Sequence, residues 1–181
     1  MGKHDKLSVF ISLILRHKPE EINLELDEFG YANVKDLLDG INKSGRYIDL
    51  DILQKIVDQD KKQRYSFNDD KTLIRANQGH SVKVNVQMQV LNPPEFLYHG
   101  TAKHSLENIL DQGIKKMSRL HVHLSENETT AVQVGKRHGE VVVLKVKAAE
   151  MGKEGYKFML SENGVWLTEF VPSKYIEILN R

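Results

Sequence analysis

Three short segments of the sequence carry basic side chains whose types and spacing suit phosphate binding. Arg16 and His17 stand side by side in LRHKP, Arg64 lies in KQRYSF, and Arg75 opens RANQGHS. Guanidinium groups stay charged near neutral pH and donate two hydrogen bonds at once to phosphate oxygens. A cluster of arginines therefore indicates an anion rather than a metal, and we expect these four side chains to converge on one anion.

The neighbouring residues support two readings of these segments. Arg16 and His17 can simply complement the dipole at a helix C-terminus, and Arg64 and Arg75 can be solvated charges on a hairpin. Three consecutive cations exceed what a helix end needs, however. RANQGHS also has little apolar content, as is typical of loops that touch a ligand. We therefore assign RNA or phosphate contacts to four of its residues: Arg75, Gln78, His80 and Ser81.

The second half of the chain holds further imidazoles near strand-like sequence. His99 precedes a glycine in LYHGT, where the missing side chain lets a ligand approach the backbone. In SRLHVHLS, strand alternation places Arg119, His121 and His123 on one face. Two histidines at i, i+2 can chelate zinc. No third ligand of matching spacing follows and the chain has no cysteine, so we expect no metal site.

Several function classes lack their signatures here. The sequence has no GxGxxG after a strand, no GxxxxGK[ST] and no nucleophile elbow. A net charge of +1 over 181 residues limits nucleic-acid contact to a local basic patch. We identify no signal peptide and no apolar run that could span a bilayer. These features predict a cytoplasmic protein that does not bind membranes.

Three helices and a hairpin must position the basic residues of the first half. Apolar residues at helical spacing predict a helix over residues 5–17 that ends before Pro19. The segment LELDEFGYANV predicts a short kinked strand. Asn33 and Asp49 are expected to cap two further helices, and RYSFNDDKTLIRA predicts a hairpin. The order helix, strand, helix, helix, hairpin is that of a winged helix.

The second half of the chain has a different pattern of predicted secondary structure. Residues 79–94 predict a boundary, after which strands dominate and two short helices follow FLYHGT and LHVHLS. EVVVLKVKA, YKFML, GVWLTEF and YIEIL predict four more strands. We therefore expect an α+β chain with domains at residues 1–90 and 91–181.

At this point the sequence resembles the RNA 2′-phosphotransferase family of the KptA type. The resemblance covers about residues 7–172 and rests on LSVFISLILRHKP, LDEFGYANV, KQRYSF, IRANQGHS, LYHGT, SRLHVHLS, VGKRHG and GVWLTEFVP. It implies an N-terminal winged-helix lobe that binds RNA. It also implies a C-terminal, NAD-binding lobe like the ADP-ribosyltransferases, built of antiparallel β-sheets with short helices.

The resemblance also implies an activity and its residues. The family removes an internal RNA 2′-phosphate, transfers it to NAD⁺ through an RNA-2′-phospho-ADP-ribose intermediate, and releases nicotinamide and ADP-ribose 1″,2″-cyclic phosphate. In eukaryotes this phosphate is left by tRNA splicing. The family's catalytic set matches Arg16, His17, Arg64 and Arg119. The cofactor-binding residues implied are His99, Gly100, Thr101, His123 and Val165.

The sequence departs from the wider ADP-ribosyltransferase pattern at two of these positions. The common His-Tyr-Glu triad would place tyrosine at His123 and glutamate at Val165. A carboxylate would repel a phosphate nucleophile, so its loss suits this chemistry. The implied partners are NAD and a tRNA-like 2′-phosphorylated RNA, with no metal and no obligate protein partner. Two alternatives stay open: an ADP-ribosyltransferase acting on nucleic-acid phosphate ends, and a non-catalytic RNA-binding protein.

Overall fold

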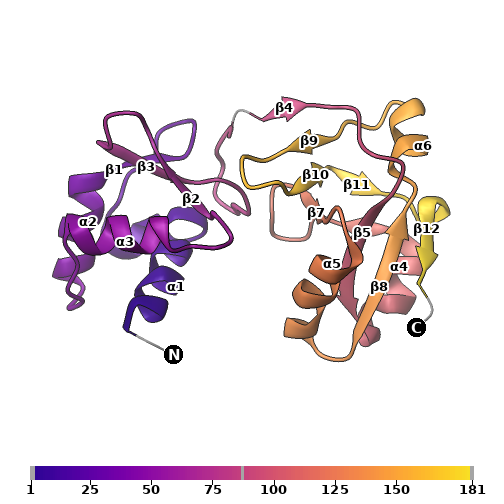
Figure 1. The fold of residues 1–181 in the computed structure, drawn as a ribbon, viewed down its shortest axis with the longest axis horizontal. Helices are drawn as coiled ribbons and strands as arrows, with labels where there is room; N and C mark the ends of the chain where they lie inside the picture. The colour runs from indigo at the N-terminus through magenta and orange to yellow at the C-terminus, as the bar shows by residue number, and fades with distance from the viewer. Residues whose placement is uncertain (1–2, 87, 180–181) are drawn as a thin grey trace. The chain divides into compact units, whose positions relative to one another are not determined.

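A computed structural model describes residues 3–86 and 88–179 of the chain as a mixture of helices and antiparallel sheets (Figure 1). The predicted α+β class is confirmed. The chain forms two compact units, residues 1–87 and 88–181. The sequence predicted that the first domain ends at residue 90. Strand β4 (Gln89–Val90) nevertheless pairs with a strand of the second unit, β9. The assignment of RNA and NAD to the two units, and their likeness to named folds, stay predictions.

The N-terminal unit combines three helices with one three-stranded sheet of order β1-β3-β2. Its elements are α1 (Lys3–Arg16), the 3₁₀ helix η1 (Pro19–Ile22), β1 (Tyr31–Asn33), α2 (Val34–Lys43), α3 (Leu50–Asp58), β2 (Tyr65–Phe67) and β3 (Leu73–Ala76). The Asn33 carboxamide accepts hydrogen bonds from the first turn of α2, and the Asp49 carboxylate does so for α3. Both predicted caps and the predicted hairpin are confirmed.

One apolar core holds this unit together. The predicted stripe of α1 is buried, with Ile11 and Ile14 fully covered beside residues of α2, α3 and β3. The buried ring of Tyr65 on β2 reaches α1, where its hydroxyl donates to the Ser8 carbonyl oxygen at 2.6 Å. Helix α1 and the strand that begins next to Arg64 are therefore joined directly.

The segment before α2 differs from its prediction. Residues 24–34 were expected to form a short strand kinked at a turn over residues 27–30; that turn is present, but only Tyr31–Asn33 pairs with β3. The Asp27 carboxylate accepts hydrogen bonds from the backbone N–H groups of Phe29 and Tyr31. Gly30 has φ 82°, which a side chain would strain. This local turn takes the donors that a longer strand would need.

The C-terminal unit is built from short strands and short helices. Its elements are β4 (Gln89–Val90), β5 (Leu97–Ala102), η2 (Lys103–Ser105), α4 (Leu106–Gln112), β6 (Ile114–Lys115), β7 (Val122–Leu124), α5 (Glu128–Gly135), η3 (Lys136–His138), β8 (Val141–Val146), α6 (Ala148–Lys153), β9 (Met159–Leu160), β10 (Trp166–Thr168), β11 (Phe170–Val171), η4 (Ser173–Tyr175) and β12 (Ile176–Ile178). The sheets have the orders β4-β9-β10-β7, β12-β8-β5 and β11-β6.

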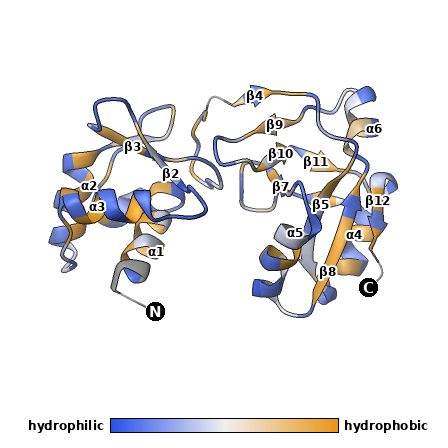
Figure 2. Ribbon diagram, viewed as in Figure 1, coloured by the Kyte–Doolittle hydropathy of each residue, from blue (hydrophilic) through white to orange (hydrophobic). Residues whose placement is uncertain are grey.

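The two larger sheets of this unit share a core and are tied together at one point. Tyr98 and Ser125 exchange backbone hydrogen bonds of 2.8 Å each, which link β5 to the end of β7. Strand β8 is hydrophobic along most of its length (Figure 2). Helix α6 was not predicted from the sequence. GVWLTEF was predicted as one strand, but Glu169 separates β10 from β11, which pairs in another sheet. In the described part of the chain, no helix has the length and apolar content to cross a bilayer.

Helix α5 packs closely against β5 at a pair of glycines. A Cβ added to Gly100 would overlap the carbonyl oxygen of Ala131 and lie 2.6 Å from its carbonyl carbon. A Cβ on Gly135 would lie 3.0 Å from the Gly100 carbonyl carbon. The space beside Gly100, where the sequence predicted that a ligand approaches the backbone, is filled by the backbone of α5.

We predict that Gly100→Ala destabilises the fold by at least about 3 kcal/mol, because a backbone contact cannot move aside. Chemical denaturation measures the change. Gly155→Ala is the control, since nothing lies within 4 Å of its added Cβ and only its φ of 93° opposes the change. We expect the control to lose about 1 kcal/mol, and equal losses in both variants would contradict the packing argument.

Candidate functional site

The end of α1 is joined to the loop that follows β3. The carbonyl oxygen of Arg16 accepts hydrogen bonds from the backbone N–H groups of Ser81 at 2.9 Å and Val82 at 3.3 Å. His17 Nδ1 lies 2.9 Å from Ser81 Oγ. Backbone N–H groups thus satisfy the last carbonyl of the helix. The adjacent cationic side chains are not needed for that purpose.

Positive side chains gather around a buried histidine at this junction. His80 is 2% exposed, and Arg75 on β3 is 8% exposed. Burial above all, and then the charges of Arg16, His17 and Arg75, together lower the pKa of His80 from 6.5 to about 4. His80 is therefore neutral near pH 7. An anion placed here would meet two permanent charges and an uncharged imidazole.

Two glycines make room for this cluster. A Cβ on Gly79 would lie 3.6 Å from the Arg16 guanidinium carbon, and one on Gly30 would lie 3.4 Å from His80 Nε2. Both glycines have positive φ values, 88° and 82°. The guanidinium of Arg75 also lies 4.7 Å from the ring centre of Tyr31. Backbone turns and an aromatic face thus fix where the positive charges lie.

The structure brings some of the predicted residues together within the N-terminal unit. Arg16, His17, Arg75 and His80 lie close together in the N-terminal unit. Gln78 is half-buried in the same loop. Arg64 directly precedes β2, and its Nη1 contacts the Asp60 carboxylate at 2.5 Å. Arg119 belongs to the C-terminal unit. Their roles in binding or catalysis stay predictions.

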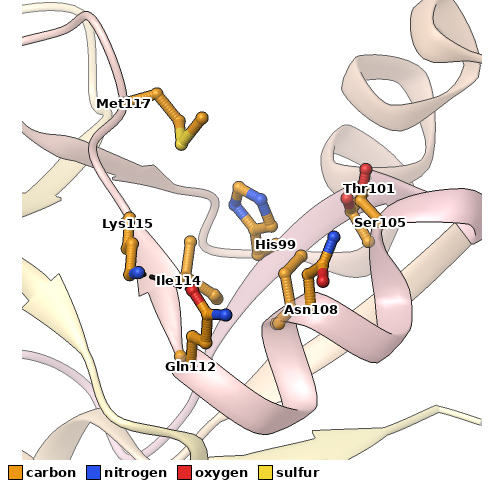
Figure 3. A pocket seen from close by; sticks show the side chains of 10 residues that line it. His99, Thr101, Ser105, Asn108, Gln112, Ile114, Lys115 and Met117 are labelled. Carbon is orange, nitrogen blue, oxygen red and sulfur yellow. Dashed lines mark hydrogen bonds between the residues drawn. The ribbon is translucent and has the colours of Figure 1, made fainter.

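A pocket of about 470 Å³ lies in the C-terminal unit beside β5 (Figure 3). His99 and Thr101 line it from the strand, as the alternation of β5 requires. The other lining residues come from α4 and the chain on either side of it: Ser105, Asn108, Ile109, Gln112, Gly113, Ile114, Lys115 and Met117. This mixture of apolar and hydrogen-bonding groups, with a size within the range of ligand pockets, suits a nucleoside-sized ligand.

The remaining predicted cofactor residues have other positions. His123 lies on β7, and its backbone carbonyl oxygen is 3.1 Å from Nδ1 of His99 on β5. Gly100 faces α5. Val165 lies in the turn before β10, where its N–H donates to Ser161 Oγ at 3.0 Å. His99 and Thr101 are thus the predicted cofactor residues that line this pocket.

The loop that carries Arg119 borders the same region. Arg119 is exposed, and its Nη1 lies 3.4 Å from His123 Nδ1. Met117, which lines the pocket, is 83% exposed and has φ 54°. Lys116 pairs with Glu169 at 2.7 Å and so fastens the loop near β10. Within residues 3–86 and 88–179, no group of three or more histidine or acidic residues is placed to hold a metal ion.

Two kinds of residue near these sites were not predicted from the sequence. Asp60 stands four positions before Arg64, a spacing that often indicates an ion pair in helices. Here it lies in a loop, where that rule does not apply. Ser105, Asn108 and Gln112 lie on successive turns of one helical segment. The spacing of three and four residues could have revealed a polar face directed at His99.

Comparison with known proteins gives a consistent result. The family model described as RNA 2′-phosphotransferase, Tpt1/KptA family, matches residues 2–170. A probable RNA 2′-phosphotransferase of Fusobacterium nucleatum is 59% identical over 178 residues, which are 98% of this chain and 99% of that protein. One from Flavobacterium johnsoniae is 49% identical over 94% of both chains. One from Pectobacterium carotovorum is 46% identical over 97% of this chain and 95% of its own.

We predict that His80 makes the stability of the protein depend on pH. Unfolded His80 takes up a proton below about pH 6.5, whereas folded His80 stays neutral down to about pH 4. The unfolded state then binds more protons, so the free energy of unfolding falls by up to about 3 kcal/mol as the pH drops through this window. Urea denaturation at pH 7 and pH 4.5 measures the difference.

His80→Gln should remove most of that difference, because glutamine does not titrate. His104→Gln is the control, since His104 is exposed on η2. The carboxylates that titrate in the same window are common to all three proteins and cancel in the comparison. A His80→Gln protein with the same pH dependence as the control would show that His80 is not held neutral.

Proposed function

The chain belongs to the RNA 2′-phosphotransferase, Tpt1/KptA, family, and from this premise we propose that it is an enzyme that removes a 2′-phosphate from RNA. The observation that carries the proposal is that the guanidinium groups of Arg16 and Arg75 gather with His17 around the neutral His80. A dianionic phosphate ester is the kind of group that such a cluster binds best.

We propose further that NAD⁺ accepts the phosphate and is consumed. The pocket beside His99 and Thr101 supports this assignment, because it has the volume for part of a dinucleotide and offers hydroxyl, carboxamide and imidazole groups. Ser105, Asn108 and Gln112 are suited to hydrogen bonds with ribose and base. Lys115, whose ammonium donates to Gln112 at 2.6 Å, is suited to a diphosphate.

The proposed reaction has two steps. In the first, an oxygen of the RNA 2′-phosphate attacks C1″ of the nicotinamide ribose. The C1″–N bond breaks, and nicotinamide leaves with the bonding electrons. In the second, the 2″-hydroxyl attacks phosphorus, the bond from phosphorus to the RNA 2′-oxygen breaks, and that oxygen takes a proton. The products are 2′-hydroxyl RNA and ADP-ribose 1″,2″-cyclic phosphate.

The arginines have the larger part in the second step. Charge grows on the phosphoryl oxygens in its transition state, and Arg16, Arg64 and Arg119 are assigned to stabilise it. Loss of one preorganised donor of this kind costs about 3 kcal/mol, or about a hundredfold in rate. Fixed guanidinium groups supply the positive charge that Mg²⁺ provides in many phosphoryl-transfer enzymes.

His17 is assigned to proton transfer because imidazole titrates near neutral pH. Its contact with Ser81 Oγ holds the ring and places Nδ1 against a hydroxyl. The other ring nitrogen, Nε2, then lies on the opposite edge of the imidazole, where it can take the proton of the 2″-hydroxyl. His80 is excluded from this role, because a group with a pKa of about 4 is a weak base at neutral pH.

Product analysis tests the proposal. A 2′-phosphorylated oligoribonucleotide is incubated with the protein, with and without NAD⁺, and every phosphorus-containing product is identified. We expect free nicotinamide, 2′-hydroxyl RNA and cyclic phosphate only when NAD⁺ is present. A stable ADP-ribosylated RNA as the final product would instead indicate an ADP-ribosyltransferase. RNA binding that is insensitive to NAD⁺, without nicotinamide release, would indicate a non-catalytic RNA-binding protein.

In the same assay, Arg119→Ala should slow the second step by about a hundredfold and cause the RNA adduct to accumulate. Arg137→Ala is the control, since Arg137 is an exposed cation on η3 of the same unit. Normal turnover without adduct in Arg119→Ala would refute the role given to Arg119.

The pocket assignment gives a separate prediction. Asn108→Trp should fill the pocket and raise the KM for NAD⁺ by at least about tenfold, while RNA affinity stays unchanged. Glu107→Trp adds the same bulk to α4 at an exposed position outside the pocket. Steady-state rates at varied NAD⁺ measure the effect. Equal KM values for the two variants would mean that NAD⁺ does not occupy this pocket.

A further inference from the structure

The loop between α3 and β2 contains a carboxylate that binds Arg64 in two ways. One oxygen of Asp60 accepts the backbone N–H of Arg64 at 2.7 Å, and the other contacts Nη1 of its guanidinium at 2.5 Å. The second oxygen also accepts the N–H of Lys62 at 3.2 Å. The Asp60 side chain is 6% exposed, whereas that of Arg64 is 30% exposed. A buried anion thus holds a cation that still reaches solvent.

The backbone at Arg64 is fixed independently of this ion pair. The Arg64 carbonyl oxygen accepts the N–H of Asn77 at 2.8 Å, and the Asn77 carboxamide donates to the Gln63 carbonyl oxygen at 2.8 Å. Ser66 Oγ donates to the same carboxamide at 2.6 Å. Asn77 is 3% exposed. Because this network already holds the strand, the contact with Nη1 chiefly orients the guanidinium.

That orientation matters for an arginine that must bind phosphate. Arginine has large rotamer freedom, which binding would otherwise have to remove. A guanidinium held at Nη1 presents its Nε–Nη2 edge, a pair of donors matched to two phosphate oxygens. The same carboxylate repels a dianion nearby. The carboxylate therefore fixes the orientation of the guanidinium and weakens its attraction for the phosphate before reaction. This is expected of a group that acts in the transition state.

We propose that Asp60 is a positioning residue, which holds the guanidinium of Arg64 in the orientation that stabilises the phosphate during transfer. This inference rests on the proposed function and goes beyond it, because Asp60 itself touches neither substrate. It predicts a separation of kinetic constants that a merely structural residue would not produce. Loss of the carboxylate should lower kcat without weakening the binding of the phosphorylated RNA.

The test compares Asp60→Asn with Asp58→Asn and wild type. Asparagine keeps an oxygen for the backbone N–H groups but presents no charge to Arg64. Asp58 lies two residues earlier and accepts a hydrogen bond from Gln54, so its variant is a matched loss of charge. We expect kcat of Asp60→Asn to fall by at least about tenfold, with an unchanged or lower KM for 2′-phosphorylated RNA. Asp60→Glu, which restores the charge, should recover part of kcat.

Two results would overturn the inference. One is a kcat of Asp60→Asn within twofold of that of Asp58→Asn. The other is a loss of kcat that follows a fall in melting temperature and is recovered on cooling, which would mean that Asp60 only stabilises the loop. Wild type and Asp58→Asn must release cyclic phosphate in the same assay. If they do not, the proposed function fails and not the role of Asp60.

A measurement on the wild-type protein covers the case in which Asp60→Asn does not fold. Side-chain ¹⁵N relaxation of the ligand-free protein reports how ordered the Nε–H bond of Arg64 is. The Arg64 signal is assigned by its disappearance in Arg64→Lys. We expect Arg64 to be clearly more ordered than the exposed Arg137. Equal disorder in both arginines would show that Asp60 does not preorganise Arg64.

Discussion

The hydrogen bonds from Ser81 and Val82 to the carbonyl oxygen of Arg16 are the contact on which the N-terminal site depends. A helix end normally leaves several carbonyls without partners, and solvent or side chains satisfy them. Here the partners are N–H groups of a loop that begins at the end of β3. The side chain of His17 and the loop containing His80 are thereby fixed beside each other. The last carbonyl of α1 is thus capped by backbone donors rather than by cationic side chains.

The same contact explains why the site contains a neutral imidazole among permanent charges. A protonated His80 would add a third buried positive charge beside Arg16 and Arg75, and burial makes that form costly. Arg16, Arg75 and the neutral His80 therefore keep a constant charge near neutral pH. His17 is half-buried with its Nδ1 against the Ser81 hydroxyl, so the two histidines of this junction have different surroundings.

Local rules predicted the parts of the fold that depend on neighbours in sequence. The caps at Asn33 and Asp49, the buried stripe of α1 and the hairpin of β2 and β3 all follow from side chains within a few residues of the backbone they satisfy. The break at Glu169 could not be predicted, because it depends on a partner strand, β6, more than fifty residues away. The burial of His80 could not be predicted, because the residues around it are polar and because it depends on the backbone turn at Gly79. Asp60 was overlooked because its role depends on a loop conformation.

Strand β5 separates the parts of the C-terminal unit that can diverge between relatives from the parts that cannot. The side chains of His99 and Thr101 border the pocket, where Asn108 and Gln112 can be exchanged singly on a seven-residue helix. On its other side, Gly100 and Gly135 leave no room for even a methyl group. Ligand preference can therefore drift in evolution while the framework beneath it stays the same. Attempts to change which ligand this pocket accepts would have most freedom on α4.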